Sequence, residues 1–177
     1  SMKKKALKPT PWGRVHYLCV TVNHGRNWGD AIDAVGPSTL PSFHVRRVGD
    51  LYPPTLGSIA EEELVLLNLG QNGGGWNQAL AWGKVKRLKL TIPRSVFAIG
   101  EYYPNLPAEL GFDPMYDDNT MHVVATTECL FDDDREACAV WWRDRKRGAD
   151  INRLQTFGGA YDWFVFCRPS ATVKDRP

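Results

Sequence analysis

The chain has 177 residues, of which 43% are hydrophobic and 24% are charged, and its formal net charge at pH 7 is +2. These values are typical of one globular domain that is large enough to bury a core without cross-links. So small a net charge does not by itself indicate a nucleic-acid or membrane partner. No apolar run approaches the roughly 18 residues that a membrane-spanning helix needs, so we expect no membrane contact.

The first half of the chain predicts several strands and one short helix. Asn27 can cap a helix over residues 28–35, which Gly36 and Pro37 would end. Residues 37–58 are rich in proline, glycine and serine and therefore predict a loop. Runs rich in β-branched or aliphatic residues predict three strands, namely 15–22, 43–48 (within that loop) and 64–69.

The second half predicts two helices followed by strands. Apolar and small residues at helical spacing indicate the first helix: Trp76, Ala79, Leu80 and Gly83. Thr91 and Pro93 signal the start of the second helix, which should end at about Tyr103. A loop is expected over 104–119 and a turn over 132–134. Strands are expected over 122–127, 137–143 and 161–168, so the fold class is α+β, with two central helices packed on an antiparallel sheet.

The chain should form one domain over residues 15–169, between a flexible tail over 1–14 and a polar tail over 170–177. Lys3, Lys4 and Lys5 resemble the start of a signal peptide, but the residues that follow contain no apolar segment. We therefore expect a cytoplasmic protein.

The cysteine pattern gives no sign of a metal site. Cys19, Cys129, Cys138 and Cys167 are widely spaced, with no Cys-x-x-Cys pair and no histidine at zinc spacing. We expect four free thiols and no cofactor. A disulfide between Cys19 and Cys167 is the alternative for an oxidising compartment.

From Trp76 onward, the motifs follow a recognisable order. Trp76, Ala79 and Trp82 are spaced W-x-x-A-x-x-W on the expected helix, and three further segments follow, namely 88–93, 123–127 and 164–168. This order resembles that of bacterial C-type-lectin-like domains of the formylglycine-generating type. The resemblance implies a C-type-lectin-like architecture over about residues 76–168.

The same resemblance does not imply that family's oxidase activity. Phe97 and Ala98 stand where an acidic residue is usual, and the two catalytic cysteines of formylglycine generation have no counterparts. The layout of the chain is also similar to that of small bacterial proteins, and this second resemblance implies no function.

The best candidate binding surface in the sequence is an aromatic and basic segment near the end. Trp141 and Trp142 are adjacent on a strand, so their side chains point to opposite faces. A basic loop follows directly, with Arg143, Arg145 and Arg147. An exposed tryptophan beside these cations would suit a planar ligand with negative charge. The alternatives are two covered tryptophans and a solvated hairpin loop.

Other clusters carry weaker signals. Asp113, Asp117, Asp118 and Asn119 form one acidic loop and Asp132 to Asp134 another, but neither has the spacing of a known calcium site. His16 and Cys19 would lie on opposite faces of one strand, which excludes that dyad. His24 and His44 would need to meet Cys129 or Glu128 in space. Gly73 to Gly75 precede a helix without the motif of a phosphate-binding loop.

Three functions therefore fit the sequence. The first is a non-catalytic module that binds a ligand or a protein through its last strands. The second is a nucleic-acid-associated protein that uses the basic segments 84–89 and 143–147. The third is a hydrolase or transferase whose site forms only in the folded chain, although no catalytic motif is present.

Overall fold

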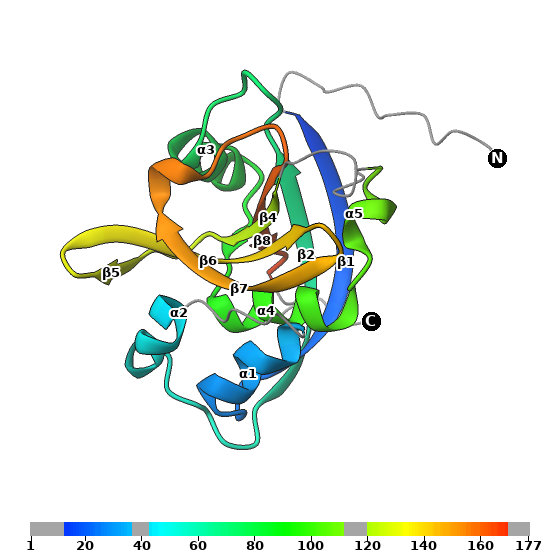
Figure 1. Cartoon of the computed structure of the whole chain (residues 1–177). Helices are drawn as coiled ribbons and strands as arrows, with labels where there is room; N and C mark the ends of the chain where they lie inside the picture. Colours follow the sequence, from blue (N-terminus) through cyan, green and yellow to red (C-terminus); the bar gives the residue numbers. More distant parts are fainter. Residues whose placement is uncertain (1–12, 37–42, 112–119, 170–177) are drawn as a thin grey trace.

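The computed structural model describes residues 13–36, 43–111 and 120–169, which form one open sheet of eight strands with helices on both faces (Figure 1). The strands are β1 (Arg14–Asn23), β2 (Ile59–Asn68), β3 (Lys89–Leu90), β4 (Met121–Ala125), β5 (Cys129–Phe131), β6 (Asp134–Arg143), β7 (Lys146–Arg153) and β8 (Asp162–Cys167).

The strand order is β1-β2-β8-β4-β6, and β7 pairs with the far edge of β6. The short strand β3 pairs with the end of β8, and β5 pairs with the start of β6. All pairs are antiparallel except β4 with β8, which are parallel. The sheet is therefore mixed, and the expected purely antiparallel arrangement is wrong at its centre.

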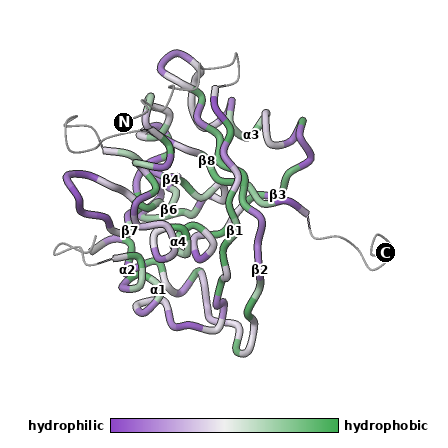
Figure 2. The backbone as a smooth tube through the Cα atoms, turned by 90° about the vertical axis from the view of Figure 1, so that its right-hand side faces the viewer, coloured by the Kyte–Doolittle hydropathy of each residue, from purple (hydrophilic) through white to green (hydrophobic). Residues whose placement is uncertain are grey.

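The helices divide between the two faces of the sheet. Helices α1 (Trp28–Val35), α2 (Phe43–Arg47) and α4 (Pro93–Tyr102) cover one face, and α3 (Trp76–Val85) covers the other (Figure 1). A short helix, α5 (Leu106–Glu109), follows α4. Figure 2 shows hydrophobic residues concentrated along the inner strands β4 and β8, between the two groups of helices. Burial on both faces explains why β8 is apolar along nearly its whole length.

Local sequence signals explain the helix boundaries. The Asn27 side chain accepts a hydrogen bond from the Asp30 N–H at 2.9 Å and caps α1. Pro93 occupies the first position of α4. On α3, a Cβ added at Gly83 would lie 2.3 Å from the Phe166 ring, so a residue without a side chain lets the helix approach β8. The predicted helices over 28–35 and within 76–103 are thus confirmed.

Two tight turns connect the last strands. The two residues between β5 and β6, Asp132 and Asp133, have φ values of 49° and 65°, and Asp144 and Arg145, between β6 and β7, have φ values of 49° and 63°. Positive φ at both central residues is the type I′ geometry that matches the twist of a hairpin. The turn predicted over 132–134 is therefore confirmed at Asp132 and Asp133, whereas Asp134 is already the first residue of β6. The segment after Arg143, by contrast, turns at once into a strand instead of a loop.

The structure also corrects three predictions about single elements. The expected strand over 43–48 is the helix α2, because Val45 and Val48 are spaced three apart and both are buried. Strand β7 was not expected, since its charged residues hide the alternation of Ala149 and Ile151, which are buried against the helices. Helix α5 lies where a loop was expected. Among the described residues, no helix is long and apolar enough to cross a bilayer.

Candidate functional site

Two of the five residues predicted for binding have structural contacts in the core. Trp142 is 4% exposed, and its Nε1 donates a hydrogen bond to the Pro104 carbonyl at 3.0 Å. The Nε of Arg147 donates to the carbonyls of Val35 at 2.7 Å and Gly100 at 3.1 Å. These contacts tie β6 to the segment that follows α4, and β7 to α1 and α4.

The other three predicted residues reach the surface. Trp141 is half-buried on the face opposite to Trp142, where it pairs across the strands with His122. Arg143 and Arg145 are exposed at the β6–β7 turn. The alternation of a strand thus separates the two tryptophans as expected.

A basic groove with an aromatic wall lies at the other end of the sheet, between β1, β2 and the end of α3. It has a volume of about 680 Å³, a size common for small-molecule sites. We call it the basic groove, and its lining residues are Val15, Tyr17, Val65, Trp82, Lys86, Arg87, Leu88, Arg168 and Pro169. Val65 and Trp82 are buried, so part of the lining is apolar.

Three cations and one exposed ring give the basic groove its chemistry. Tyr17 is 59% exposed, and the Arg168 guanidinium lies over its ring at 4.9 Å from the centroid. Lys86 and Arg87 are exposed. Among the described residues, Arg168 is the one of these three cations that forms an ion pair, with Glu63 at 3.7 Å between side chains that are both more than half exposed, a geometry that contributes little. The groove therefore presents positive charge beside a stacking surface.

Arg87 stands at a position that favours glycine. It follows the last turn of α3 with a φ of 57°. The Leu88 N–H donates to the Gly83 carbonyl at 3.0 Å, as in a helix C-terminal motif that usually places glycine there. A left-handed backbone costs a non-glycine residue about 1 kcal/mol. The chain has arginine at this position in spite of the cost, and the arginine places a guanidinium at the groove.

Replacing Arg87 by glycine should therefore stabilise the protein by about 1 kcal/mol, which corresponds to a rise of roughly 2–4 °C in Tm for a chain of this size. Thermal unfolding followed by circular dichroism measures this shift. Lys84→Gly serves as a control, because Lys84 lies inside α3 and glycine there should destabilise by about 1 kcal/mol. An unchanged or lowered Tm for Arg87→Gly would contradict the strained-cap interpretation.

The two basic segments of the sequence do not meet. Lys89 pairs with Cys167, at the end of β8. The β6–β7 turn lies near Met121 at the start of β4, and the start of β4 pairs with Asp162 at the start of β8. The length of β8 separates them. The segments 84–89 and 143–147 therefore do not form one continuous stripe.

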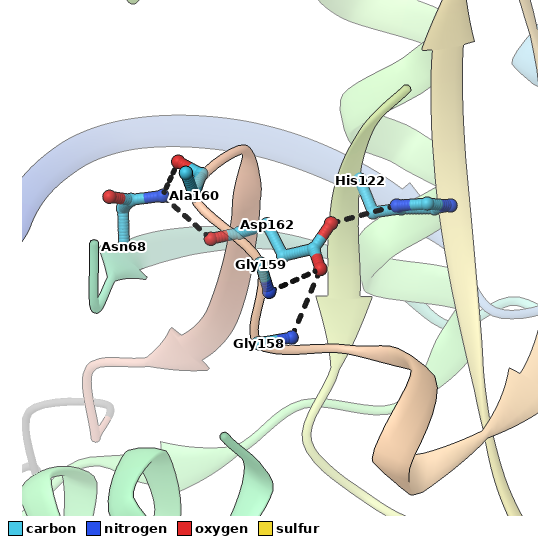
Figure 3. A network of polar contacts seen from close by, with 6 residues as sticks. All are labelled: Asn68, His122, Gly158, Gly159, Ala160 and Asp162. Carbon is cyan, nitrogen blue, oxygen red and sulfur yellow. Dashed lines mark hydrogen bonds and ion pairs between the residues drawn. The ribbon is translucent and has the colours of Figure 1, made fainter. Parts of the chain in front are cut away.

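A second polar cluster joins β4, β8 and the loop before β8 (Figure 3). His122 Nδ1 lies 2.8 Å from Asp162 Oδ1, and the N–H groups of Gly158 and Gly159 donate to Asp162 Oδ2 at 3.0 Å and 2.9 Å. The side chains of His122 and Asp162 are 16% and 8% exposed. Because a carboxylate only accepts hydrogen bonds, His122 donates from Nδ1.

This arrangement orients His122 and also holds the loop. The His122 ring packs edge-on against Phe157, with 5.4 Å between the ring centroids. Asn68 donates hydrogen bonds to the carbonyls of Ala160 and Asp162 at 2.8 Å and 2.9 Å. An oriented imidazole can act as a base through Nε2. The contacts of this cluster account fully for a role in fastening the loop over 157–160 to the sheet.

The remaining histidine candidates, His24 and His44, contact side chains from two different elements, β2 and β5. His24 lies 3.0 Å from Glu62, which also accepts a hydrogen bond from Ser95 at 2.5 Å. His44 packs edge-on against Phe131. Within the described ranges, no group of three or more His, Cys, Asp or Glu side chains is arranged to hold a metal. The acidic loop Asp113 to Asn119 lies outside the described residues.

All four cysteines carry free thiols. Cys129 and Cys138 interact with each other and with Tyr52: a hydrogen bond with Cys138 lowers the pKa of Cys129, and the same bond together with burial raises that of Cys138. Burial raises the pKa of Tyr52 as well.

At Gly73 to Gly75, the Gln78 side chain accepts a hydrogen bond from the Gly75 N–H at 2.9 Å. That N–H is thus already bonded within the protein.

Comparisons with models of protein families, with curated proteins and with solved structures found no match for this chain.

Proposed function

We propose that this chain is a non-catalytic binding module and that its ligand is a planar, negatively charged molecule held in the basic groove. The observation that carries the proposal is the pairing of Arg168 with the exposed ring of Tyr17, beside Lys86 and Arg87. An exposed ring gives a stacking surface for a planar group, and the cations attract an anion. The strained backbone at Arg87 supports the proposal, because strain is retained more often where a side chain has a function.

Two further parts of the proposal concern family and location. The C-type-lectin-like architecture is proposed from the order of motifs between Trp76 and Arg168. A reducing compartment such as the cytoplasm is proposed because four free thiols persist there. Neither part is needed for the binding proposal.

Adenosine monophosphate combines a planar ring with an anion and is therefore a suitable probe. We expect it to bind the wild type in calorimetric titration, and adenosine or ribose 5-phosphate alone to bind at least about tenfold more weakly, because each lacks one of the two groups. Tyr17→Ala should weaken binding by about 1–3 kcal/mol, which is the range for loss of one stacked base.

The control for charge is a pair of double variants with equal net charge. Lys86→Gln with Arg87→Gln removes two cations from the basic groove, whereas Arg143→Gln with Lys146→Gln removes two exposed cations at the β6–β7 turn. We expect the first pair to weaken binding and the second pair to leave it unchanged. Equal losses in both would show that net charge, and not the groove, governs binding.

A further inference from the structure

We propose that the outer edge of β1 binds an extended segment of a partner protein, in which basic and apolar residues alternate, by adding that segment to the sheet as a further strand. Strand β1 is the first in the order β1-β2-β8-β4-β6, and within the described residues no strand pairs with its outer side (Figure 1). The inference does not rest on the proposed function, because it concerns the backbone edge of β1 and not the basic groove.

The register of the sheet shows which backbone groups of β1 face this edge. The Arg168 N–H donates to the Glu63 carbonyl at 2.9 Å, so the backbone groups of Glu63 point toward β8. Those of Glu62 therefore point toward β1, because successive residues of a strand alternate. Glu62 pairs with Val20, whose groups accordingly face β2. The odd-numbered residues of β1 thus direct their N–H and carbonyl groups to the outer edge.

The odd-numbered residues in the middle of β1 are Tyr17, Cys19 and Thr21. Among the described residues, one group bonds to their outward backbone groups: the Tyr103 hydroxyl donates to the Cys19 carbonyl at 2.7 Å. This contact agrees with the register. A carbonyl oxygen has two lone pairs and can accept a second hydrogen bond. The middle of β1 therefore offers a row of donors and acceptors to an incoming strand.

Strand β1 also lacks the features that usually protect an open edge. It pairs with β2 over all ten of its residues without a bulge. Residues 17–23 contain no proline and no charged side chain. Natural proteins commonly protect an edge with charges, proline or a bulge, so an unprotected edge of this length is suited to strand addition.

The surroundings of the edge determine which partner fits. A hollow of about 580 Å³ lies there, lined by Cys19, Val20, Thr21, Glu61, Glu62, Glu63, Tyr102 and Tyr103. Glu61 and Glu63 are exposed and lie on the face away from α4, because Leu64, which alternates with them, packs into the core on the α4 side. Tyr102 and Tyr103 flank the edge from the end of α4. An added strand would meet carboxylates on one face and rings on the other.

Charge complementarity favours a basic partner. Lysine or arginine side chains on one face of the added strand would lie near Glu61 and Glu63, and no cation lines the hollow. Apolar side chains on its other face would contact the rings of Tyr102 and Tyr103. A second copy of β1 is uncharged from Tyr17 onward and offers these carboxylates no cation. We therefore infer a different protein as the partner.

A fluorescein-labelled peptide of about nine residues, the length of one strand, in which lysine and valine alternate, tests this inference by fluorescence anisotropy. We expect saturable binding, and at least about tenfold weaker binding of the peptide in which glutamate replaces lysine.

Backbone N-methylation of the peptide gives a matched pair of probes. In an antiparallel pair, residues that bond to each other carry their side chains on the same face. Lysines on the face of Glu61 and Glu63 therefore stand opposite Cys19 and Thr21, and their N–H groups bond to β1. N-methylation at the lysines should weaken binding at least about tenfold, whereas N-methylation at the valines, whose N–H groups point away from β1, should leave it unchanged.

A pair of double variants with equal net charge tests the selection by charge. Glu61→Gln with Glu63→Gln should weaken binding of the lysine peptide at least about fivefold at low salt. Asp132→Asn with Asp133→Asn removes two exposed carboxylates at the β5–β6 turn, where asparagine tolerates the positive φ. This control should leave the affinity unchanged.

Each other outcome overturns the inference. If the lysine peptide does not bind, or if the two N-methylated peptides bind equally or in the reverse order, the peptide is not added to β1 as described. Equal losses in the two double variants would mean that net charge governs binding. If analytical ultracentrifugation shows a dimer that Thr21→Pro dissociates, a second copy and not a basic partner occupies the edge. Proline is tolerated at an edge position whose N–H faces outward.

Discussion

Asp162→Ala should lower the free energy of unfolding by about 3 kcal/mol, the upper end of the range for leaving a buried hydrogen-bonding group without its partner. The Asp162 carboxylate accepts hydrogen bonds from His122 and from the N–H groups of Gly158 and Gly159, and its side chain is 8% exposed. Without it, these donors lose their acceptor in a poorly solvated position. Urea denaturation followed by tryptophan fluorescence measures the loss.

The matched control is Asp134→Ala. Asp134 pairs with Arg153 at 3.1 Å, but both side chains are about half exposed, so the same substitution there should cost at most about 1 kcal/mol. Similar losses at Asp162 and Asp134 would contradict the assignment of the His122–Asp162 cluster as the fastening of the loop over 157–160.

Gly83→Ala should destabilise the protein by about 2 kcal/mol, although the same substitution in an open helix is stabilising. A Cβ at Gly83 would lie 2.3 Å from the Phe166 ring. Phe166 is fully buried, so its ring cannot swing away. Calorimetric or chemical unfolding of the variant measures the effect, which acts on the packing of α3 against β8 directly beneath the basic groove.

Gly29→Ala is the matched control, because Gly29 lies in α1 and its added Cβ would meet ordinary contacts at 3.4 Å and 3.7 Å. It should stabilise by about 0.5–1 kcal/mol. In the Gly83→Ala background, Phe166→Leu should recover part of the loss, since the smaller side chain removes the clash. A stabilising Gly83→Ala would mean that α3 does not pack as closely on β8 as described.

Much of the fold follows from local signals in the sequence. The Asn27 cap and the first-turn Pro93 predict α1 and α4, and the spacing of Trp76 and Ala79 predicts α3. These signals act within a few residues, so a single sequence reveals them. Strand β7 could not be predicted, because its burial depends on pairing with β6, and strand pairing is not a local property.

The basic groove could not be predicted from the sequence, for a similar reason. Tyr17 and Arg168 lie at opposite ends of the chain, and only the pairing of β1 with β2 and of β2 with β8 brings them together. The cations over 84–89 were recognisable from sequence as a candidate surface. Their aromatic partner was hidden, because Tyr17 reads as one more residue of a buried strand. By contrast, the tryptophan pair could be recognised in the sequence. The burial of Trp142 could not, because it depends on the tertiary contact with Pro104.

The measurement that tests the central claim most directly is a map of amide chemical shifts during titration of ¹⁵N-labelled protein with adenosine monophosphate. The proposal predicts the largest shifts at Tyr17, at residues 86–88 and at Arg168, with the β6–β7 turn unaffected. Shifts concentrated at Trp141 and Arg143 instead, or no saturable shifts at all, would contradict the assignment of the basic groove as the binding site.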